Sequence, residues 1–262
     1  MKRTRVGNVD VIALVDTIQA YPAAGVYPTA GDAIKGYSHY LDSEGRVALN
    51  FGCFALRDGS TTVLVDTGLG PESNGQLLAE LDAAGVARES VSSVIFTHLH
   101  MDHTGWNLDR ATGKPNFPNA SYLVPRGDWD HFGAQNDQFF ARDVAPLEAL
   151  GRLDLIEGER VLTQACVALP TPGHTPAHTS VVISSAGERG IILGDVVLSP
   201  IDAEEPSLEN SFDWNGGIAG ETRRLMLDRL SGDGSLVGGS HLPAPGLGRF
   251  VRAGGRTAWK PL

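Results

Sequence analysis

Hydrophobic residues in the first quarter of the chain fall into short runs separated by polar turns. Residues 6–18, 51–56 and 61–65 are rich in β-branched, aliphatic and aromatic side chains. Such runs are typical of strands, and the Asp58-Gly59 pair between the last two runs is a common hairpin turn. The pattern therefore predicts that the chain opens with antiparallel strands.

The spacing of apolar residues changes from strand-like to helical after residue 65. Ser73 and Gln76 have the spacing of a capping box, and apolar residues at helical intervals then continue to Gly85. The apolar run 91–97 predicts the next strand, and this alternation of strand, helix and strand is what a layered α/β fold requires. Further along, the pattern predicts strands at residues 120–124, 153–156, 165–169, 180–184, 190–193 and 236–241, and a helix at residues 221–230.

Two segments are rich in aromatic residues and lack a clear period. Residues 21–41 contain four of the five tyrosines and predict a long loop, which serves either as a lid or binding wall or only packs on the surface. Residues 126–144 predict a helical excursion. We interpret it as an ordinary packed helix pair, with a cap over a site or a dimer contact as the alternatives.

Composition and length limit the class of protein. Of the 262 residues, 42% are hydrophobic and 20% are charged, a globular composition that argues against disorder, collagen and coiled coil. We expect a single domain over residues 1–262. No apolar run approaches the roughly 20 residues that span a bilayer, and the N-terminal run 11–15 is too short for a signal peptide. The expected protein is cytoplasmic, with no membrane partner.

Charge and cysteine content narrow the partners further. The formal net charge of -10 argues against a nucleic-acid partner, because phosphate binding needs a basic face. Cys53 and Cys166 each lie inside an apolar segment. We expect two buried free thiols rather than a disulfide or metal ligands.

A cluster of metal-type side chains follows the predicted strand 91–97. His98, His100, Asp102 and His103 fall within six residues. In an extended segment, residues two apart point to the same side, so the first two histidines can face one ion while the last two residues turn toward a second. A lone histidine is usually structural, but four metal-competent residues at this spacing indicate a metal site.

Three later residues also end apolar strands and could converge on the same sheet edge. These are His174, Asp195 and His241, each beside glycine, serine or threonine.

The whole arrangement resembles the metallo-β-lactamase fold. The hallmark His-x-His-x-Asp-His is present at residues 98–103, and Gly173-His174-Thr175, Gly194-Asp195 and Gly239-Ser240-His241 match later family positions in order. The resemblance implies an α/β chain folded as a four-layer αβ/βα sandwich. It also implies an early aspartate turn, here at residues 65–68.

The resemblance implies a binuclear metal site. One ion would be bound by His98, His100 and His174, the other by Asp102, His103 and His241, with Asp195 shared between them. The donor set suits two divalent ions, Zn²⁺ first, with Fe, Mn or Co as alternatives. A bridging hydroxide would attack an ester-like substrate, and the catalytic residue Asp102 would pass a proton to the leaving group.

The other polar residues of the pattern receive lesser roles. Asp66 is expected to orient the metal loop through hydrogen bonds. His178 is interpreted as structural, and His39 and His131 as surface residues. Trp106 either lines a pocket or packs beneath the loop.

Departures within the superfamily narrow the chemistry. Flavodiiron-type members carry Glu where this chain has His100, so hydrolysis is favoured, and about twenty residues after His241 leave little room for the helical domain of glyoxalase II-like thioesterases. Quorum-quenching lactonases often have a tyrosine where this chain has Leu198. The segment 104–107 resembles methyl-parathion-hydrolase-like enzymes.

We therefore expect a metal-dependent hydrolase of a small-molecule carboxylic ester or lactone, with phosphotriesters as a further option. The alternatives are a thioesterase similar to glyoxalase II and a mononuclear iron sulfur dioxygenase. A homodimer is left open.

Overall fold

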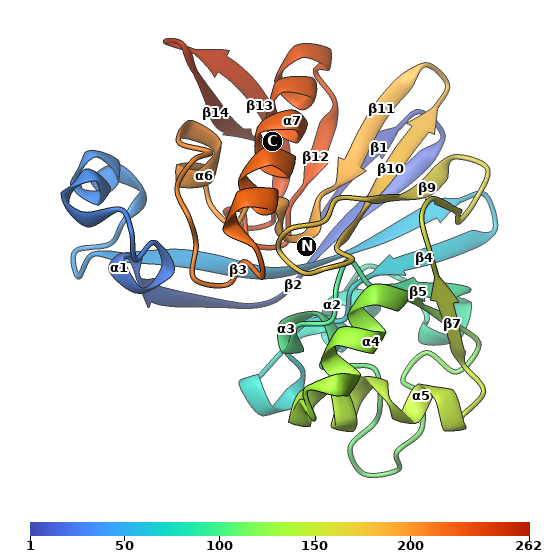
Figure 1. The fold of residues 1–262 in the computed structure, drawn as a ribbon. Coiled ribbons are helices and arrows are strands. Elements are labelled where there is room, and N and C mark those ends of the chain that lie inside the picture. Colours follow the sequence, from blue (N-terminus) through green and yellow to red (C-terminus); the bar gives the residue numbers. More distant parts are fainter.

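The computed structural model describes residues 1–262 as two seven-stranded sheets, with helices on the outer faces of both (Figure 1). The first sheet runs in chain order from β1 to β7, and the second from β8 to β14. The predicted α/β layered fold is confirmed.

The first sheet combines an antiparallel and a parallel half. Pairing is antiparallel from β1 to β4 and parallel from β4 to β7. Its strands are β1 (Lys2–Val6), β2 (Val9–Pro22), β3 (Arg46–Asp58), β4 (Thr61–Val65), β5 (Ser93–Ile95), β6 (Ser121–Pro125) and β7 (Leu153–Ile156). The Asp58-Gly59 turn joins β3 to β4, as predicted.

The second sheet is antiparallel except where β11 pairs with β12. Its strands are β8 (Arg160–Val161), β9 (Cys166–Pro170), β10 (Thr179–Ser185), β11 (Glu188–Ile192), β12 (Leu236–Gly238), β13 (Leu247–Ala253) and β14 (Arg256–Pro261). The parallel pair is joined by a crossover that contains the longest helix, so a helix covers this sheet from outside.

Helices cover the sheets from both sides. The α-helices are α1 (Ala23–Val26), α2 (Leu77–Ala83), α3 (Met101–Thr104), α4 (Arg126–Ala134), α5 (Pro146–Ala149), α6 (Pro200–Glu204) and α7 (Gly216–Asp233). The 3₁₀-helical segments are η1 (Gly31–Tyr40), η2 (Pro71–Ser73), η3 (Arg88–Ser90) and η5 (Gly194–Val196), and η4 (Phe140–Val144) is π-helical. No helix in the structure is both long and apolar enough to cross a bilayer.

The apolar run in β2 shows why the layers form. Val11 and Ala13 pack in the core between the sheets, where they meet residues of the second sheet such as Val181. Ile12 and Leu14 point the other way, into the core beneath α2 and α4. Both faces of the strand are therefore buried, which explains an uninterrupted run of hydrophobic residues.

The capping box predicted at Ser73 is wrong. Helix α2 begins at Leu77, and no side chain of its own sequence neighbourhood caps it. The buried carboxylate of Asp16 accepts a hydrogen bond from the Leu77 amide at 2.9 Å instead. The first amide of α2 is thus satisfied by Asp16 of β2 rather than by the neighbouring Ser73.

The two aromatic segments are more ordered than a loop. Residues 21–41, predicted as a loop, form the end of β2, α1 and η1, with Tyr27 and Tyr37 buried in a small cluster of their own. Residues 126–144 form α4 and η4, where Trp129 and Phe140 meet edge to face with ring centroids 5.0 Å apart. The second segment is therefore a packed helix pair, as we predicted, and Phe132 and Phe139 from it also line the cavity described below, in line with the alternative of a cap over a site.

Candidate metal centre

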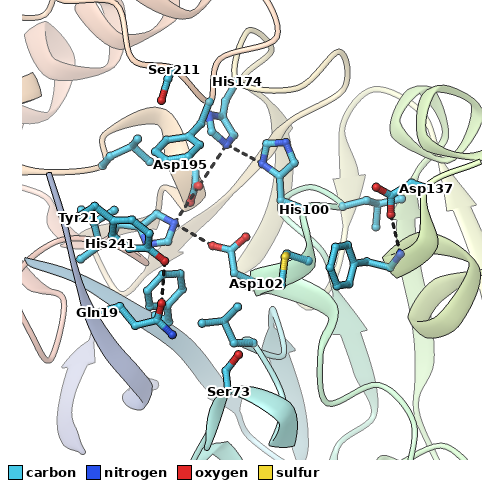
Figure 2. A pocket seen from close by; sticks show the side chains of 18 of the residues that line it. Gln19, Tyr21, Ser73, His100, Asp102, Asp137, His174, Asp195, Ser211 and His241 are labelled. Atoms are coloured by element: carbon cyan, nitrogen blue, oxygen red, sulfur yellow. Dashed lines mark hydrogen bonds and ion pairs between the residues drawn. The ribbon is translucent and has the colours of Figure 1, made fainter. Parts of the chain in front are cut away.

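The metal-type residues all follow strand ends at one side of the molecule. His98 and His100 follow β5, His174 lies between β9 and β10, Asp195 follows β11 and His241 follows β12. Figure 2 shows four of these side chains pointing toward one another at the base of a pocket. The two sheets thus present their loops to a common point.

The seven predicted ligands fall into two groups with one shared member. Potential ligand atoms of each group lie within 4.8 Å of one another. The first group is His98, His100, His174 and Asp195; the second is Asp102, His103, Asp195 and His241. Both groups match the division that the family resemblance implied.

Distances within the first group are short. Nε2 of His98 and Nε2 of His174 each lie 3.0 Å from Nδ1 of His100. Nε2 of His174 lies 3.2 Å from Oδ2 of Asp195. Three imidazole nitrogens and a carboxylate oxygen therefore face one small volume.

The second group converges in the same way. Nε2 of His103 lies 3.4 Å from both Asp102 Oδ2 and Asp195 Oδ1. Nε2 of His241 lies 3.2 Å from Asp102 Oδ2 and 3.0 Å from Asp195 Oδ2. The Asp195 carboxylate therefore directs Oδ1 toward His103 and Oδ2 toward His241.

Two buried atoms test whether this site fits a cation. His103 Nε2 and Asp195 Oδ1 are buried and have no hydrogen-bond partner. An unpaired buried polar atom is costly, and native proteins rarely leave one unsatisfied. A divalent cation between these atoms would satisfy both, so the donor set fits a metal ion.

The pKa values of the cluster show strong coupling. Burial, helped by the nearby His174, lowers the pKa of His100 to about 3. Burial also acts to lower the pKa of His241, but the carboxylates of Asp195 and Asp102 outweigh it and raise that pKa to about 10. Without a cation, histidine protons neutralise the two buried carboxylates.

Asp66 orients the first histidine loop, as predicted. Its carboxylate accepts hydrogen bonds from the Thr97 amide at 2.7 Å, the Thr97 hydroxyl at 2.8 Å and His103 Nδ1 at 2.9 Å. Asp66 itself has a positive φ of 62°, a conformation that aspartate tolerates better than most residues. The last bond leaves Nε2 of His103 directed at the cluster.

His178 is structural, in line with the prediction. Its Nδ1 donates to the carbonyl of Thr171 at 3.1 Å, and its Nε2 accepts from the Asp195 amide at 3.0 Å. Both ring nitrogens are therefore occupied. A Cβ on Gly194, which has a φ of +58°, would lie 2.6 Å from this ring, so only glycine allows the close approach.

Three orienting residues were missed from the sequence. Asp128 accepts from the Leu99 amide at 3.3 Å, the Thr175 hydroxyl at 2.8 Å and the Ala177 amide at 2.8 Å. It therefore joins the two histidine-bearing loops. Asp213 and Arg223 bond behind His174. No motif marks any of them, because their partners are distant in sequence and mostly backbone groups.

A cavity of about 570 Å³ opens above the cluster (Figure 2). Ten of its 19 lining residues are hydrophobic, among them Phe51, Phe132, Phe139 and Phe212. No lysine or arginine lines it. Its shape and polarity suit an apolar, uncharged group placed next to the metal-type side chains.

The structure also shows where the remaining residues named from the sequence lie relative to the cavity. Tyr21 and Leu198 line the cavity, and the Tyr21 hydroxyl donates to Gln19 Oε1 at 2.7 Å. Trp106 does not line it and donates to Asp16 at 2.8 Å, so it packs beneath the loop. His39 is exposed, as expected.

The remaining expectations for single residues also held. His131 is partly exposed, and Cys53 and Cys166 are buried free thiols.

Comparison with protein families places this site in a known context. The family model described as the metallo-beta-lactamase superfamily matches residues 53–241. Metallo-beta-lactamase domain-containing protein 1 of Xenopus laevis is 34% identical over 166 residues, which cover 63% of this chain and 59% of that protein. An N-acyl homoserine lactonase of a Bacillus species is 28% identical over 166 residues, which cover 54% of this chain and 61% of that protein. The chain thus spans about three-fifths of these relatives.

Solved structures share the fold over nearly the whole chain. AidC, a dizinc quorum-quenching lactonase in complex with a product, superposes with a TM-score of 0.86 at 23% identity, covering 100% of this chain and 97% of its own. The hydrolase AbOPH superposes with a TM-score of 0.85 at 25% identity, covering 99% and 96%. The two-sheet architecture is therefore that of the family.

Proposed function

The chain belongs to the metallo-beta-lactamase superfamily, and from this premise we propose that it is a metal-dependent hydrolase of uncharged carboxylic esters or lactones. One observation carries the proposal. Seven metal-type side chains, two of them with unsatisfied buried atoms, meet at the base of a mostly apolar cavity that no lysine or arginine lines. Such a site places a hydrolytic centre against an uncharged, apolar substrate.

The proposed metal ligands are the two groups described above. His98, His100 and His174 would bind one divalent ion, Asp102, His103 and His241 the other, with Asp195 shared. When bound, such a pair of cations supplies Lewis acidity and a water activated for attack near neutral pH. Zinc is the metal proposed first, because imidazole and carboxylate donors suit it.

Asp102 is proposed to carry the proton from the attacking water to the leaving group. Its side chain is 16% exposed, whereas those of His103 and Asp195 are almost fully buried, and it lines the cavity. Burial acts to raise its pKa, but the adjacent His103 and His241 outweigh this and lower it. The residue is therefore a carboxylate that can receive a proton from the attacking water and deliver it to the leaving alkoxide.

The cavity favours neutral substrates over anionic ones. Away from the metal-type residues, an anionic group would lose its hydration in a lining that has no lysine or arginine to pair with it and that contains Asp137. This disfavours thioesters of charged carriers. Lactones with an apolar acyl chain meet the requirement, and N-acyl homoserine lactonases are among the relatives.

A substrate panel on zinc-reconstituted protein tests the proposal. It should contain aryl esters, γ-lactones with acyl chains of several lengths, thioesters, a phosphotriester and a β-lactam, with bound metal measured in the same samples. We expect hydrolysis of the neutral esters or lactones, with two metal ions per chain. Inactivity across the panel would refute the proposal. One iron per chain with oxygen uptake on persulfides would replace it by a dioxygenase.

A further inference from the structure

Arg223 of α7 is a fully buried cation. It is 1% exposed and is the largest of the fully buried side chains. Removing a guanidinium from water costs several kcal/mol unless hydrogen bonds and opposite charges compensate. The hydrogen-bond partners of Arg223 therefore show which parts of the protein this side chain connects.

The hydrogen bonds of Arg223 reach the residue after Asp195, the segment 206–208 and Asp213. Nε donates to the carbonyl of Val196 at 2.9 Å, directly after Asp195 in the chain. Nη1 donates to the carbonyl of Leu208 at 3.1 Å and, more weakly, to that of Pro206 at 3.4 Å. Nη2 donates to Oδ2 of Asp213 at 3.0 Å.

Asp213 carries the connection to a proposed ligand. Its second oxygen, Oδ1, accepts from Nδ1 of His174 at 3.0 Å. That bond fixes the ring so that Nε2 faces His100 and Asp195. The Asp213 carboxylate is 1% exposed, and a carboxylate behind a metal-binding histidine sets its tautomer and orientation.

The segment 208–213, which ends at Asp213, also forms one wall of the cavity. Ser211 and Phe212 both line the cavity, and Ser211 is labelled beside His174 in Figure 2. Arg223 hydrogen-bonds to Leu208, which precedes these two residues, and to Asp213, which follows them. The wall and the orienting carboxylate are therefore fastened by one side chain.

Helix α7 is also packed tightly on the loop that bears His174. A Cβ on Gly173 would lie 2.4 Å from backbone atoms of Ala219 in α7. The amide of Asn215, which caps α7, donates to the Gly173 carbonyl at 3.0 Å. The helix thus provides a rigid platform behind His174.

We propose that Arg223 is a positioning residue that, through Asp213, sets the His174 ring and holds the adjoining cavity wall in the same arrangement. The inference rests on the proposed function, in which His174 binds a metal ion and the cavity binds substrate. Loss of the guanidinium would then weaken metal binding and loosen the wall together.

The experiment compares Arg223→Met, Arg223→Lys and Asp213→Asn with Arg224→Met, a control at the exposed neighbouring position of α7. Zinc affinity is measured by competition with a chromogenic chelator, and ligand geometry by the visible spectrum of the cobalt-substituted protein. We expect Arg223→Met and Asp213→Asn to lose about 10- to 100-fold in zinc affinity and to change the cobalt spectrum. Arg224→Met should do neither, and Arg223→Lys should recover part of the affinity.

Kinetics on the ester or lactone that the panel identifies provide the second readout. Arg223→Met should raise KM more for long acyl chains than for short ones, because Ser211 and Phe212 lose their support. A folded Arg223→Met protein with unchanged zinc affinity, cobalt spectrum and KM would overturn the proposal and leave a purely structural arginine.

Two safeguards keep the test decisive. If Arg223→Met does not fold, Arg223→Lys decides, because the lysine keeps the charge but replaces the planar set of donors that joins Val196, Leu208 and Asp213; wild-type zinc affinity and cobalt spectrum in that variant would overturn the proposal. The zinc and cobalt readouts need no substrate. They therefore separate failure of this inference from failure of the proposed hydrolase activity, which would show only in the substrate panel.

Discussion

The two sides of the metal centre are built in different ways. On one side, four proposed ligands come from the six residues 98–103, which form the loop after β5 and most of α3. On the other side, His174, Asp195 and His241 come from the ends of three separate strands of the second sheet. We refer to these as the motif side and the assembled side.

The supports of the two sides differ as well. The motif side is held by Asp66, which follows β4, the strand that pairs with β5. The assembled side depends on long-range partners: Asp213 and Arg223 behind His174, and the Asn50 carbonyl, which accepts from His241 Nδ1 at 2.7 Å. A local turn needs one carboxylate, whereas a site collected from distant loops needs a buried polar network.

The largest expected effect is the loss of a ligand on the motif side. His98→Ala should lower hydrolysis by more than about 100-fold and reduce the bound metal, because a ligand matters more than its supporting residue. Activity and metal content are measured on the same preparation, with the exposed His39→Ala as control. Intact hydrolysis with reduced metal would contradict the proposed role of this centre.

Asp66→Asn and Asp213→Asn should separate the two groups of proposed ligands. The amide would face the donors on Thr97 and His103, so we expect a loss of about 10- to 100-fold in affinity for the ion of the second group. Asp213→Asn should instead weaken the first group. Stepwise cobalt titration of both variants checks this, and equal losses at both ions would show that the two groups are not independently supported.

Metal affinity should rise with pH. Because the carboxylates of Asp195 and Asp102 overcome burial and raise the pKa of His241 to about 10, this histidine is protonated in the metal-free protein at neutral pH. Metal binding must displace that proton, so affinity falls at low pH and increases about tenfold per pH unit for each proton released. Calorimetry in buffers of different ionisation enthalpy counts the protons. Zinc affinity that is constant through the neutral range would disagree.

Asp128→Asn tests the link between the two sides. Its carboxylate accepts from Leu99 on the motif side and from Thr175 and Ala177 on the assembled side. The variant turns an amide toward these donors, so the free energy of unfolding should fall by roughly 1–3 kcal/mol. Denaturant unfolding measures this, with the exposed Asp130→Asn as control. Equal stability of the two variants would argue against the link.

The smallest effect is expected at Ser73. Because Asp16 rather than Ser73 receives the first amide of α2, Ser73→Ala should change the free energy of unfolding by no more than about 0.5 kcal/mol. The same denaturant measurement applies. A loss of about 1 kcal/mol, typical of a removed cap, would restore the capping box.

Sequence patterns predicted the strands and helices better than the residues that hold the site in place. Strands such as β4 and β5 were found because buried strands are short apolar runs, and the site residues because each follows such a run. The helical order within residues 21–41 was not found. Its tyrosines gain their burial from residues distant in sequence: Tyr27 and Tyr37 pack in a cluster with residues of β3, Leu69 and Ile201. Tyr27 also bonds Ser199 and Tyr40 bonds Glu204, at the two ends of α6.

Asp128, Asp213 and Arg223 could not have been found in the same way. Each looks like an ordinary charged surface residue in the sequence, and nothing in its neighbours differs from a solvated turn or helix face. Their partners are backbone amides, carbonyls and one histidine, brought near by the packing of α4 and α7.

By itself, the sequence determined the α/β class, the strand ends and the residue types that could bind a metal, because periodicity and local ligand spacing are properties of neighbouring residues. The tertiary structure decided which metal-type side chains lie within reach of one another, what orients them and what kind of cavity lies above them. These depend on distances between residues such as Arg223 and Val196, which only the packing of the sheets and helices sets.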